Sequence, residues 1–316
     1  MRFNENADLD TSRIDDLRGG RRGGRALGGR ALGGRVAVGG GGLGVVGLIL
    51  YLLISQLGGT GADGFARPGG LSGLAGGQAV DTSQVAESCA TGADANTGLD
   101  CEVVAVVNSL DGYWTDAFAR SGQTYQPPRT NFFTDGVDTA CGSATSAVGP
   151  FYCPGDNEVY IDLTFFDELE STFGARGGTF ARAYVMAHEY GHHIQALLGT
   201  TSRVQRGDTG PTSGSVRLEL QADCYAGVWA NHATTVPTSS GEPLIVGVTQ
   251  DDVAAALDTA ARIGDDYIQT QLGGGQVDES RFSHGSSAQR ERWYSIGYDT
   301  GDPSRCDTFA RGVDLG

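Results

Sequence analysis

The sequence contains no lysine, so its 22 basic residues are all arginines, against 38 acidic residues and a net charge of −16 over 316 residues. A surface this acidic excludes nucleic acid as a partner. Histidine is scarce, with five residues. The six cysteines contain no Cys-x-x-Cys pair, which excludes the cysteine zinc sites and thioredoxin-like redox sites built on that motif.

The cysteines all lie after residue 88, and their even number predicts disulfides in an oxidising compartment. Six cysteines allow fifteen pairings. Proximity along the chain favours two short-range bridges and leaves a third, long-range one: Cys89–Cys101, Cys141–Cys153 and Cys224–Cys306.

The N-terminal quarter has an unusual composition. Residues 1–35 are rich in Gly and Arg and predict a disordered cytoplasmic arm. Residues 36–57 carry no charge and are long enough for a single transmembrane anchor, and the arginines before them place the N-terminus in the cytoplasm. A cleaved secretory signal is the alternative, although its charged region would be unusually long. Residues 58–85 then predict a flexible linker.

Residues 86–316 predict one extracytoplasmic domain on the cell membrane. Apolar residues recur at helical spacing in five segments, whereas alternation typical of a strand occurs in "NEVYID", residues 157–162. The fold class is therefore α+β, mostly helical with a small sheet. The predicted helices begin at these segments: "LDCEVVAVV", "TFFDELES", "TFARAYVMAHEYGHH", "SVRLELQADCYAG" and "TQDDVAAALDTAARIGDDYIQ".

Three of the five histidines fall within "HEYGHH", which contains the pattern H-E-x-x-H as His188, Glu189 and His192. Residues four apart share a helix face, so His188 and His192 can bind one zinc ion. His193 points about 100° away from His192 and is predicted to pack or to face solvent rather than to bind metal. Glu189 is not a ligand in this pattern and is the candidate general base.

A catalytic zinc ion needs a third protein ligand. The metzincin extension of the motif would place it at residue 198, which is Leu198. The remaining candidate is a downstream E-x-x-x-D pattern, in which Glu219 supplies the ligand and Asp223 hydrogen-bonds to a ligand histidine. A surface role for Asp223 is the alternative.

Donors for the developing oxyanion are expected in "FSHGSSAQRERW", where His284 and Arg290 lie six residues apart. For His284 the alternative is a loop histidine without a catalytic role. For Arg290 it is a structural ion pair in a chain this acidic.

Together, "HEYGHHIQ", "RLELQADCYAGVW" and "FSHGSSAQRERWYSIGYDTGDPSRCDTF" resemble the putative neutral zinc metallopeptidase family of bacteria. The resemblance implies a zincin-like fold, a peptide or protein substrate, His188, His192 and Glu219 as ligands of one zinc ion, and Glu189 as acid and base. In such folds an edge strand flanks the active-site helix and pairs with substrate, and residues 157–162 are the candidate.

The sequence thus predicts a membrane-anchored zinc metalloendopeptidase. Two alternatives remain open: a non-catalytic, zinc-stabilised binding module, and a zinc hydrolase acting on a non-peptide amide or ester.

Overall fold

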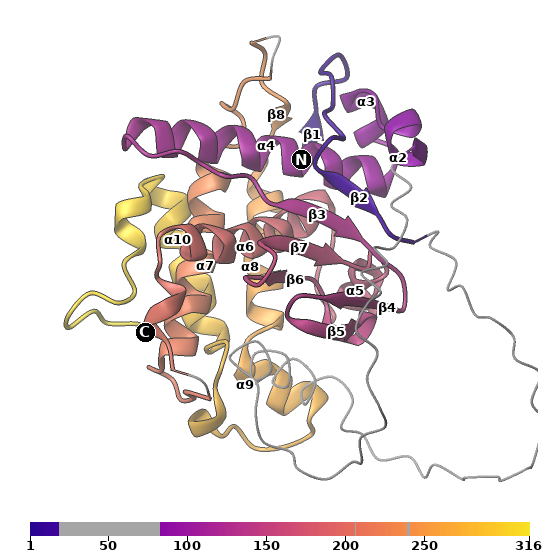
Figure 1. Ribbon diagram of the computed structural model, residues 1–316. Helices are drawn as coiled ribbons and strands as arrows, with labels where there is room; N and C mark the ends of the chain where they lie inside the picture. Colours follow the sequence, from indigo (N-terminus) through magenta and orange to yellow (C-terminus); the bar gives the residue numbers. More distant parts are fainter. Residues whose placement is uncertain (19–82, 206, 239–240) are drawn as a thin grey trace, which may run out of the picture.

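The computed structural model describes residues 1–18, 83–205, 207–238 and 241–316. It confirms an α+β fold, in which long helices pack beside a small sheet (Figure 1). The long helices are α4 (Leu99–Arg120), α6 (Thr179–Leu197), α7 (Gly214–His232), α8 (Gln250–Arg262) and α10 (Ser287–Thr300). The short helices are α2 (Ser83–Ser88), α3 (Gly92–Ala95), α5 (Phe165–Ser171) and α9 (Asp265–Tyr267).

The main sheet has the strand order β2-β3-β7-β6. Its strands are β2 (Ile14–Asp16), β3 (Arg129–Phe132), β7 (Glu158–Ile161) and β6 (Phe151–Cys153). The first three are parallel, whereas β6 runs antiparallel to β7 and forms one edge. Two further antiparallel pairs lie outside it: β1 (Arg2–Phe3) with β8 (Ile245–Gly247), and β4 (Gly136–Thr139) with β5 (Gly142–Thr145).

The strand expected at residues 157–162 exists, but its expected edge position is wrong. As β7 it lies inside the sheet between β3 and β6. Its residues Val159 and Ile161 are fully buried. The edge position belongs to β6, which is too short, with three residues, to show an alternating pattern.

Close packing of α6, α7 and α10 depends on glycines at their crossings. A Cβ at Gly191 of α6 would lie 2.8 Å from the Cα of Ala222 on α7. At the crossing of α7 and α10, a Cβ at Gly227 or Gly297 would collide with backbone of the other helix. Backbones can approach this closely only where no side chain intervenes. The glycine within the H-E-x-x-H pattern therefore brings the polar face of α7 up to the two histidines.

All five predicted helices are present, but the one predicted from "TQDDVAAALDTAARIGDDYIQ" is divided in two. There α8 ends at Arg262, and a separate short helix begins after Gly264. Helix α10 was not predicted, because its sequence has no clear apolar face. Its start is defined instead by a capping box, in which Ser286 and Gln289 bond reciprocally to each other's backbone N–H groups.

The expectation of a disordered arm over residues 1–35 is wrong for residues 1–18. Strand β2 extends the main sheet, and Phe3 and Ile14 are fully buried in the core. Arg18 donates to Asp16 and to Asp100 of α4 at 2.6 Å. Apolar burial and ladder hydrogen bonds outweigh the polar composition of this segment. These residues contact the domain directly, which is at odds with the expectation of a membrane between the two.

The expected anchor at residues 36–57 and the linker up to residue 82 lie outside the described residues. Within the described ranges, no helix combines the length and apolar character that crossing a bilayer requires. The three disulfides expected from proximity are confirmed: Cys89–Cys101, Cys141–Cys153 and Cys224–Cys306.

Candidate metal centre

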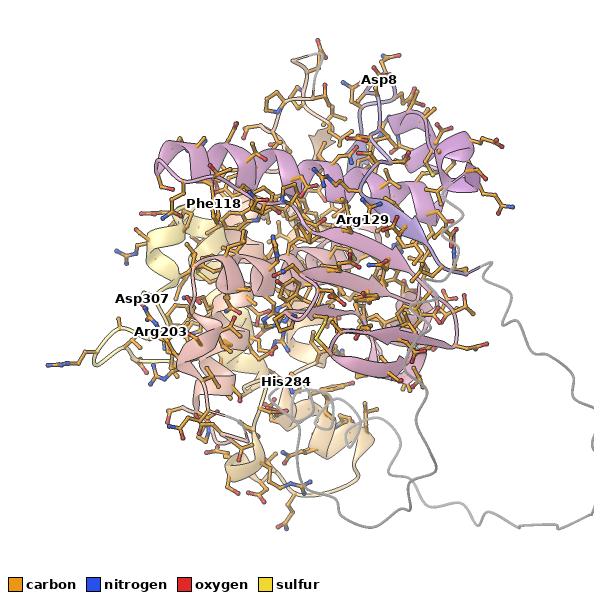
Figure 2. All side chains as sticks on the ribbon, in the orientation of Figure 1. Asp8, Phe118, Arg129, Arg203, His284 and Asp307 are labelled. Carbon is orange, nitrogen blue, oxygen red and sulfur yellow. A yellow bond between two sulfur atoms is a disulfide. The ribbon has the colours of Figure 1, made fainter. Side chains whose placement is uncertain are left out.

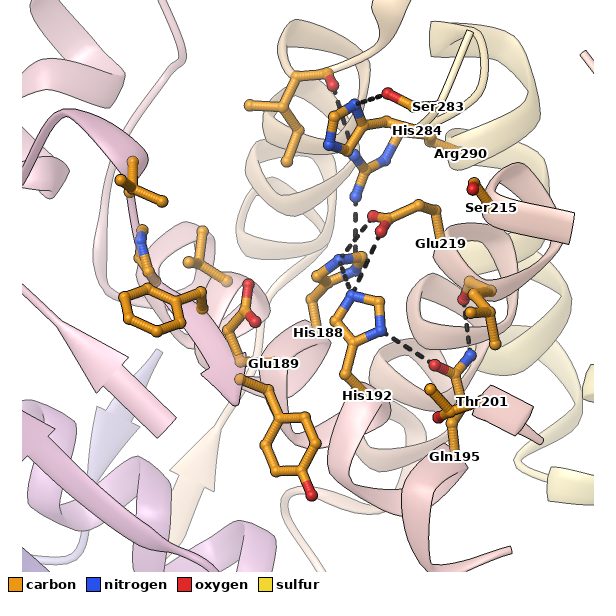
Figure 3. A pocket seen from close by; sticks show the side chains of 18 of the residues that line it. His188, Glu189, His192, Gln195, Thr201, Ser215, Glu219, Ser283, His284 and Arg290 are labelled. Carbon is orange, nitrogen blue, oxygen red and sulfur yellow. Dashed lines mark hydrogen bonds and ion pairs between the residues drawn. The ribbon is translucent and has the colours of Figure 1, made fainter. Parts of the chain in front are cut away.

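Two helices supply three ligand atoms that converge on one point. His188 and His192 lie one turn apart on α6, and Glu219 faces them from α7 (Figure 3). The Nε2 atoms of the two histidines are 3.2 Å apart. The Glu219 carboxylate lies 3.2 Å from Nε2 of His188 and 3.5 Å from Nε2 of His192. These three residues form a group able to hold a metal ion, and all are buried or half-buried.

The spacing of these atoms fits zinc. Tetrahedral ligands at about 2.1 Å from Zn²⁺ are about 3.4 Å from one another, which matches the observed separations. Gln195 Oε1 accepts from Nδ1 of His192 at 2.9 Å, and Asp223 accepts from Nδ1 of His188 at 2.8 Å. Because both Nδ1 atoms donate, the Nε2 atom of each neutral imidazole carries a lone pair. Each lone pair points towards the Nε2 atom of the other histidine and towards the Glu219 carboxylate. A metal cation bound between these atoms would make such a convergence favourable.

The ligands are held from behind by further hydrogen bonds. The Gln195 side chain that contacts His192 donates in turn to the backbone oxygen of Leu218 at 2.6 Å. Gln195 therefore couples α6 to the residue just before Glu219. Such partners orient a ligand histidine and fix which nitrogen faces the metal.

Glu189 shares the cavity with the ligands but forms no hydrogen bond or ion pair with their side chains. Its side chain lies on the side of His188 opposite Glu219 (Figure 3). Burial raises the pKa of Glu189 to about 7, more than the nearby His188 lowers it. A carboxyl group in this state can accept and return a proton near neutral pH.

Arg290 and Asp223 form a buried ion pair behind His188. Arg290 donates from Nε and Nη2 to the two oxygens of Asp223 at 2.9 and 3.0 Å. Its Nη1 donates to the backbone oxygen of Ile263 at 3.3 Å, and Tyr184 donates to Asp223 at 2.6 Å. All three guanidinium nitrogens therefore have acceptors within the protein. This geometry favours the structural ion pair over the oxyanion contact expected from sequence.

His284 reaches the cavity from the loop before α10 (Figure 3). Asp265 fixes its position. Asp265 Oδ2 accepts backbone N–H groups from Ser283, His284 and Gly285 at 2.7–2.9 Å. Asp265 Oδ1 accepts from Nδ1 of His284 at 3.1 Å. Burial lowers the pKa of His284, but the Asp265 carboxylate outweighs it and the net pKa is raised. The raised pKa favours the imidazolium form, in which the remaining nitrogen, Nε2, carries a proton and can donate into the cavity.

The structure brings together every site residue expected from sequence. His193 is buried and points elsewhere, towards the backbone oxygen of Gln126 at 2.7 Å, which favours packing over the solvent-facing alternative. Sequence analysis missed Asp265 and Tyr184. Gly264 just before Asp265 is a helix-ending pattern that could have separated it from α8. Tyr184 lies four residues before His188, but an aromatic residue there indicates only core packing.

A cavity of about 240 Å³ surrounds the three ligands, Glu189 and His284. It is bounded on one side by β6 and the loop before it, including Gly149, Phe151 and Tyr152. This side of the cavity is thus built from residues 148–152.

Comparison with known proteins identifies the family of this chain. The family described as putative neutral zinc metallopeptidase matches residues 1–309. An uncharacterized protein of Mycobacterium tuberculosis (strain ATCC 25618 / H37Rv) is 49% identical over 229 residues, covering 72% of this chain and 76% of the relative. The uncharacterized protein YpfJ of Escherichia coli (strain K12) is 38% identical over 273 residues, covering 84% of this chain and 88% of the relative. No solved structure matches significantly. The chain belongs to the putative neutral zinc metallopeptidase family.

Proposed function

We propose that this protein is a zinc metalloendopeptidase of zincin-like type that hydrolyses peptide bonds. The observation that carries the proposal is the convergence of His188, His192 and Glu219 at zinc-ligand separations, with Glu189 uncoordinated in the same cavity. A bound zinc ion would supply Lewis acidity and lower the pKa of the attacking water to about 7.

The chain's own residues move the protons. Glu189 accepts one from the attacking water as oxygen adds to the carbonyl carbon. When the C–N bond breaks, Glu189 passes that proton to the leaving amine. A residue that carries a proton between two partners needs a pKa near the working pH, and burial raises the pKa of Glu189 to about 7.

His284 is proposed as the donor to the substrate oxygen. Its Nδ1 donates to Asp265, and the raised pKa of His284 favours the imidazolium, whose Nε2–H can donate to the developing negative charge. Asp265 and Arg290 are proposed as positioning residues: Asp265 orients His284, and Arg290 holds Asp223 against His188.

Strand β6 is proposed as the edge that holds the substrate. It pairs with β7 on one side, and its residues Phe151 and Tyr152 line the cavity. An extended peptide can add to such an edge through main-chain hydrogen bonds. Three disulfides support an extracytoplasmic location for the domain. The membrane segment at residues 36–57 stays a prediction.

The test compares zinc content and cleavage of casein by the full-length protein and by Glu189→Gln. Zinc retained at one equivalent, with cleavage lowered at least about 100-fold, supports the proposal. Glu279→Gln, at an exposed position outside the cavity, should cleave like the wild type. A wild-type protein that binds zinc but cleaves no peptide contradicts it, and favours a binding module or a hydrolase of another amide or ester.

A further inference from the structure

A chain of two buried side-chain amides runs from His192 to the back of α7. Gln195 Oε1 accepts from Nδ1 of His192, and Gln195 Nε2 donates to Oε1 of Gln221 at 3.2 Å. Gln221 Nε2 donates in turn to the backbone oxygen of Cys306 at 2.8 Å. Gln195 is 1% exposed and Gln221 is 4% exposed. The two glutamines thus connect a residue of the metal centre to a segment 85 residues beyond Gln221.

The far end of this chain is fixed by a segment that is clamped to α7. Cys306 forms a disulfide with Cys224. Thr308 donates to the backbone oxygen of Arg217 at 2.7 Å, and the Arg217 guanidinium donates to the backbone oxygen of Thr308. Arg217, Gln221 and Cys224 follow one another at spacings of four and three residues, so they share one face of α7. The backbone oxygen of Cys306 is therefore held in a fixed place beside Gln221.

Backbone oxygens decide how both amides are turned. A side-chain amide can present either its oxygen or its NH₂ group to a neighbour, whereas a backbone oxygen can only accept. Because the oxygen of Cys306 accepts from Gln221, the amide oxygen of Gln221 faces Gln195. Because Leu218 and Gln221 both present oxygens, the NH₂ group of Gln195 faces them. The amide oxygen of Gln195 is thereby left for His192.

This oxygen selects one tautomer of His192. A neutral imidazole carries a single proton, and an acceptor beside Nδ1 holds the proton on that nitrogen. Nε2 then keeps its lone pair and faces the metal position beside Glu219 (Figure 3). If the Gln195 amide were turned round, its NH₂ group would favour the other tautomer. In that tautomer Nε2 carries the proton and has no lone pair for a metal ion.

His188 is held differently, by the Asp223 carboxylate at its Nδ1. A carboxylate presents only acceptors, so it cannot be turned the wrong way. The partner of His192 is a neutral amide with two different ends, and its orientation has to be set by further groups. Leu218 supplies one such constraint and Gln221 supplies the second. With both in place, a reversed Gln195 amide would bring its oxygen against two other buried oxygens, which is costly.

We propose that Gln221 is a positioning residue of the metal centre, which fixes the orientation of the Gln195 amide and thereby the metal-binding tautomer of His192. This inference rests on the zinc site of the proposed function and adds a residue that holds that site in its binding state. It does not depend on which bond the protein hydrolyses.

The tautomer can be measured directly in the full-length protein after a chelator has removed the metal. Nitrogen-15 NMR of labelled histidines shows which ring nitrogen carries the proton under mildly alkaline conditions, where a free imidazole is neutral. The signals that are absent from His192→Gln identify His192. We expect the proton on Nδ1 in the wild type and a mixture of tautomers in Gln221→Leu. A wild type with the proton on Nε2 overturns the proposal.

Zinc affinity provides a second readout, measured in competition with a chromophoric chelator. Gln195→Leu removes the direct partner of His192 and should weaken zinc binding about 10-fold or more, and Gln221→Leu should weaken it about 5-fold. Because Gln221 acts through Gln195, the double variant should bind zinc about as weakly as Gln195→Leu alone. Fully additive losses, or wild-type zinc affinity in Gln221→Leu, overturn the proposal.

Gln289→Leu is the matched control for general damage to the fold. Gln289 is 2% exposed, and its amide donates to the backbone oxygens of Pro211 and Gly316. Like Gln221→Leu, this variant removes a buried amide and leaves backbone oxygens without a donor, so its Tm should fall. Its zinc affinity should stay at the wild-type value. Equal losses of zinc affinity in Gln289→Leu and Gln221→Leu overturn the proposal.

The outcomes separate this proposal from the peptidase function. A wild type that cleaves casein, together with unchanged zinc affinity in Gln221→Leu, overturns the role of Gln221 and leaves the peptidase function intact. A wild type that carries the proton on Nδ1 of His192 and loses zinc affinity on Gln221→Leu, but cleaves no peptide, supports the role of Gln221 and contradicts the peptidase function.

Discussion

Arg290 and Asp223 meet in a buried, two-pronged ion pair directly behind a ligand histidine, although 67 residues separate them in sequence. Arg290 is 2% exposed and Asp223 is fully buried. One oxygen of Asp223, Oδ1, accepts hydrogen bonds from His188, Tyr184 and Arg290. The pair links α10 to the metal-binding faces of α6 and α7.

Removing Arg290 should destabilise the protein and weaken zinc binding. In Arg290→Met, the carboxylate of Asp223 stays buried without its cation, which costs about 3–5 kcal/mol of unfolding free energy. Zinc affinity should fall about 10-fold or more, since partners of ligand histidines contribute that much. Urea unfolding and zinc titration measure the two effects.

Arg292→Met is the matched control on the same helix. Arg292 pairs with Asp314, and their side chains are 44% and 79% exposed. Its loss should cost about 1 kcal/mol or less. Equal destabilisation by the two variants would contradict a special role for the buried pair.

Replacing Asp265 should impair catalysis through His284 without removing zinc. Asp265→Asn leaves the loop backbone an acceptor but weakens the contact to Nδ1, so we expect kcat to fall about 10-fold or more at near-normal KM and zinc content. Because Asp265 raises the pKa of His284, that pKa should fall in the variant. As the pH rises, activity that needs protonated His284 should therefore decline at a lower pH in the variant than in the wild type.

A double variant separates positioning from general damage. If Asp265 acts through His284, then Asp265→Asn added to His284→Ala should cause little further loss. Asp299→Asn, on the exposed face of α10, should behave like the wild type. Full additivity of the two losses, or an unchanged pH profile, would argue against the positioning role.

Removing the metal should destabilise the folded protein. Burial disfavours an ionised Glu219, but His192 and His188 lower its pKa, so an anion stays buried beside two imidazoles. Zinc present at 1,000 times its Kd would add about 4 kcal/mol to the unfolding free energy. A chelator should therefore lower Tm, and added zinc should restore it.

Glu219→Ala should lose zinc in dialysis conditions that leave the wild type saturated, as measured by mass spectrometry of metals. Its Tm should no longer respond to the chelator. Glu279→Ala is the control at an exposed site. Full zinc occupancy in Glu219→Ala would place the third ligand elsewhere.

The N-terminal segment should contribute to the stability of the domain. Ile14 is 1% exposed within β2, so Ile14→Asp buries a carboxylate in the core and should cost about 3 kcal/mol or more. Asp8→Asn, at an exposed position on the outer surface of the molecule, should be neutral (Figure 2). Thermal unfolding of both variants tests this, and equal Tm values would contradict the packing of β2.

Cysteine labelling tests the compartment of the same segment. All six native cysteines are in disulfides, so an introduced thiol reports alone. Asp8→Cys and Asp299→Cys should react together with a membrane-impermeant maleimide in intact cells, because the two positions belong to one folded unit. Reaction of Asp8→Cys only after permeabilisation would place the N-terminus across the membrane from the domain.

Local geometry explains what the sequence determined by itself. The helices of residues 99–120, 179–197 and 214–232 follow from apolar spacing, and the fixed turn of α6 places His188 and His192 on one face. The pattern E-x-x-x-D likewise identified Glu219 and Asp223, because their relation to each other is a single helical turn. Short spacing along the chain was enough to favour two of the disulfides.

Only the tertiary structure decided how distant segments meet. Whether Arg290 faces substrate or Asp223 depends on how α10 crosses α7 at Gly227 and Gly297, which no local pattern encodes. Asp265 acquired its role because three backbone N–H groups of a loop some twenty residues away point at its carboxylate. Strand β2 formed from a polar segment because the sheet offered it a partner in β3, and the hydrogen bonds of a strand are always made with another part of the chain.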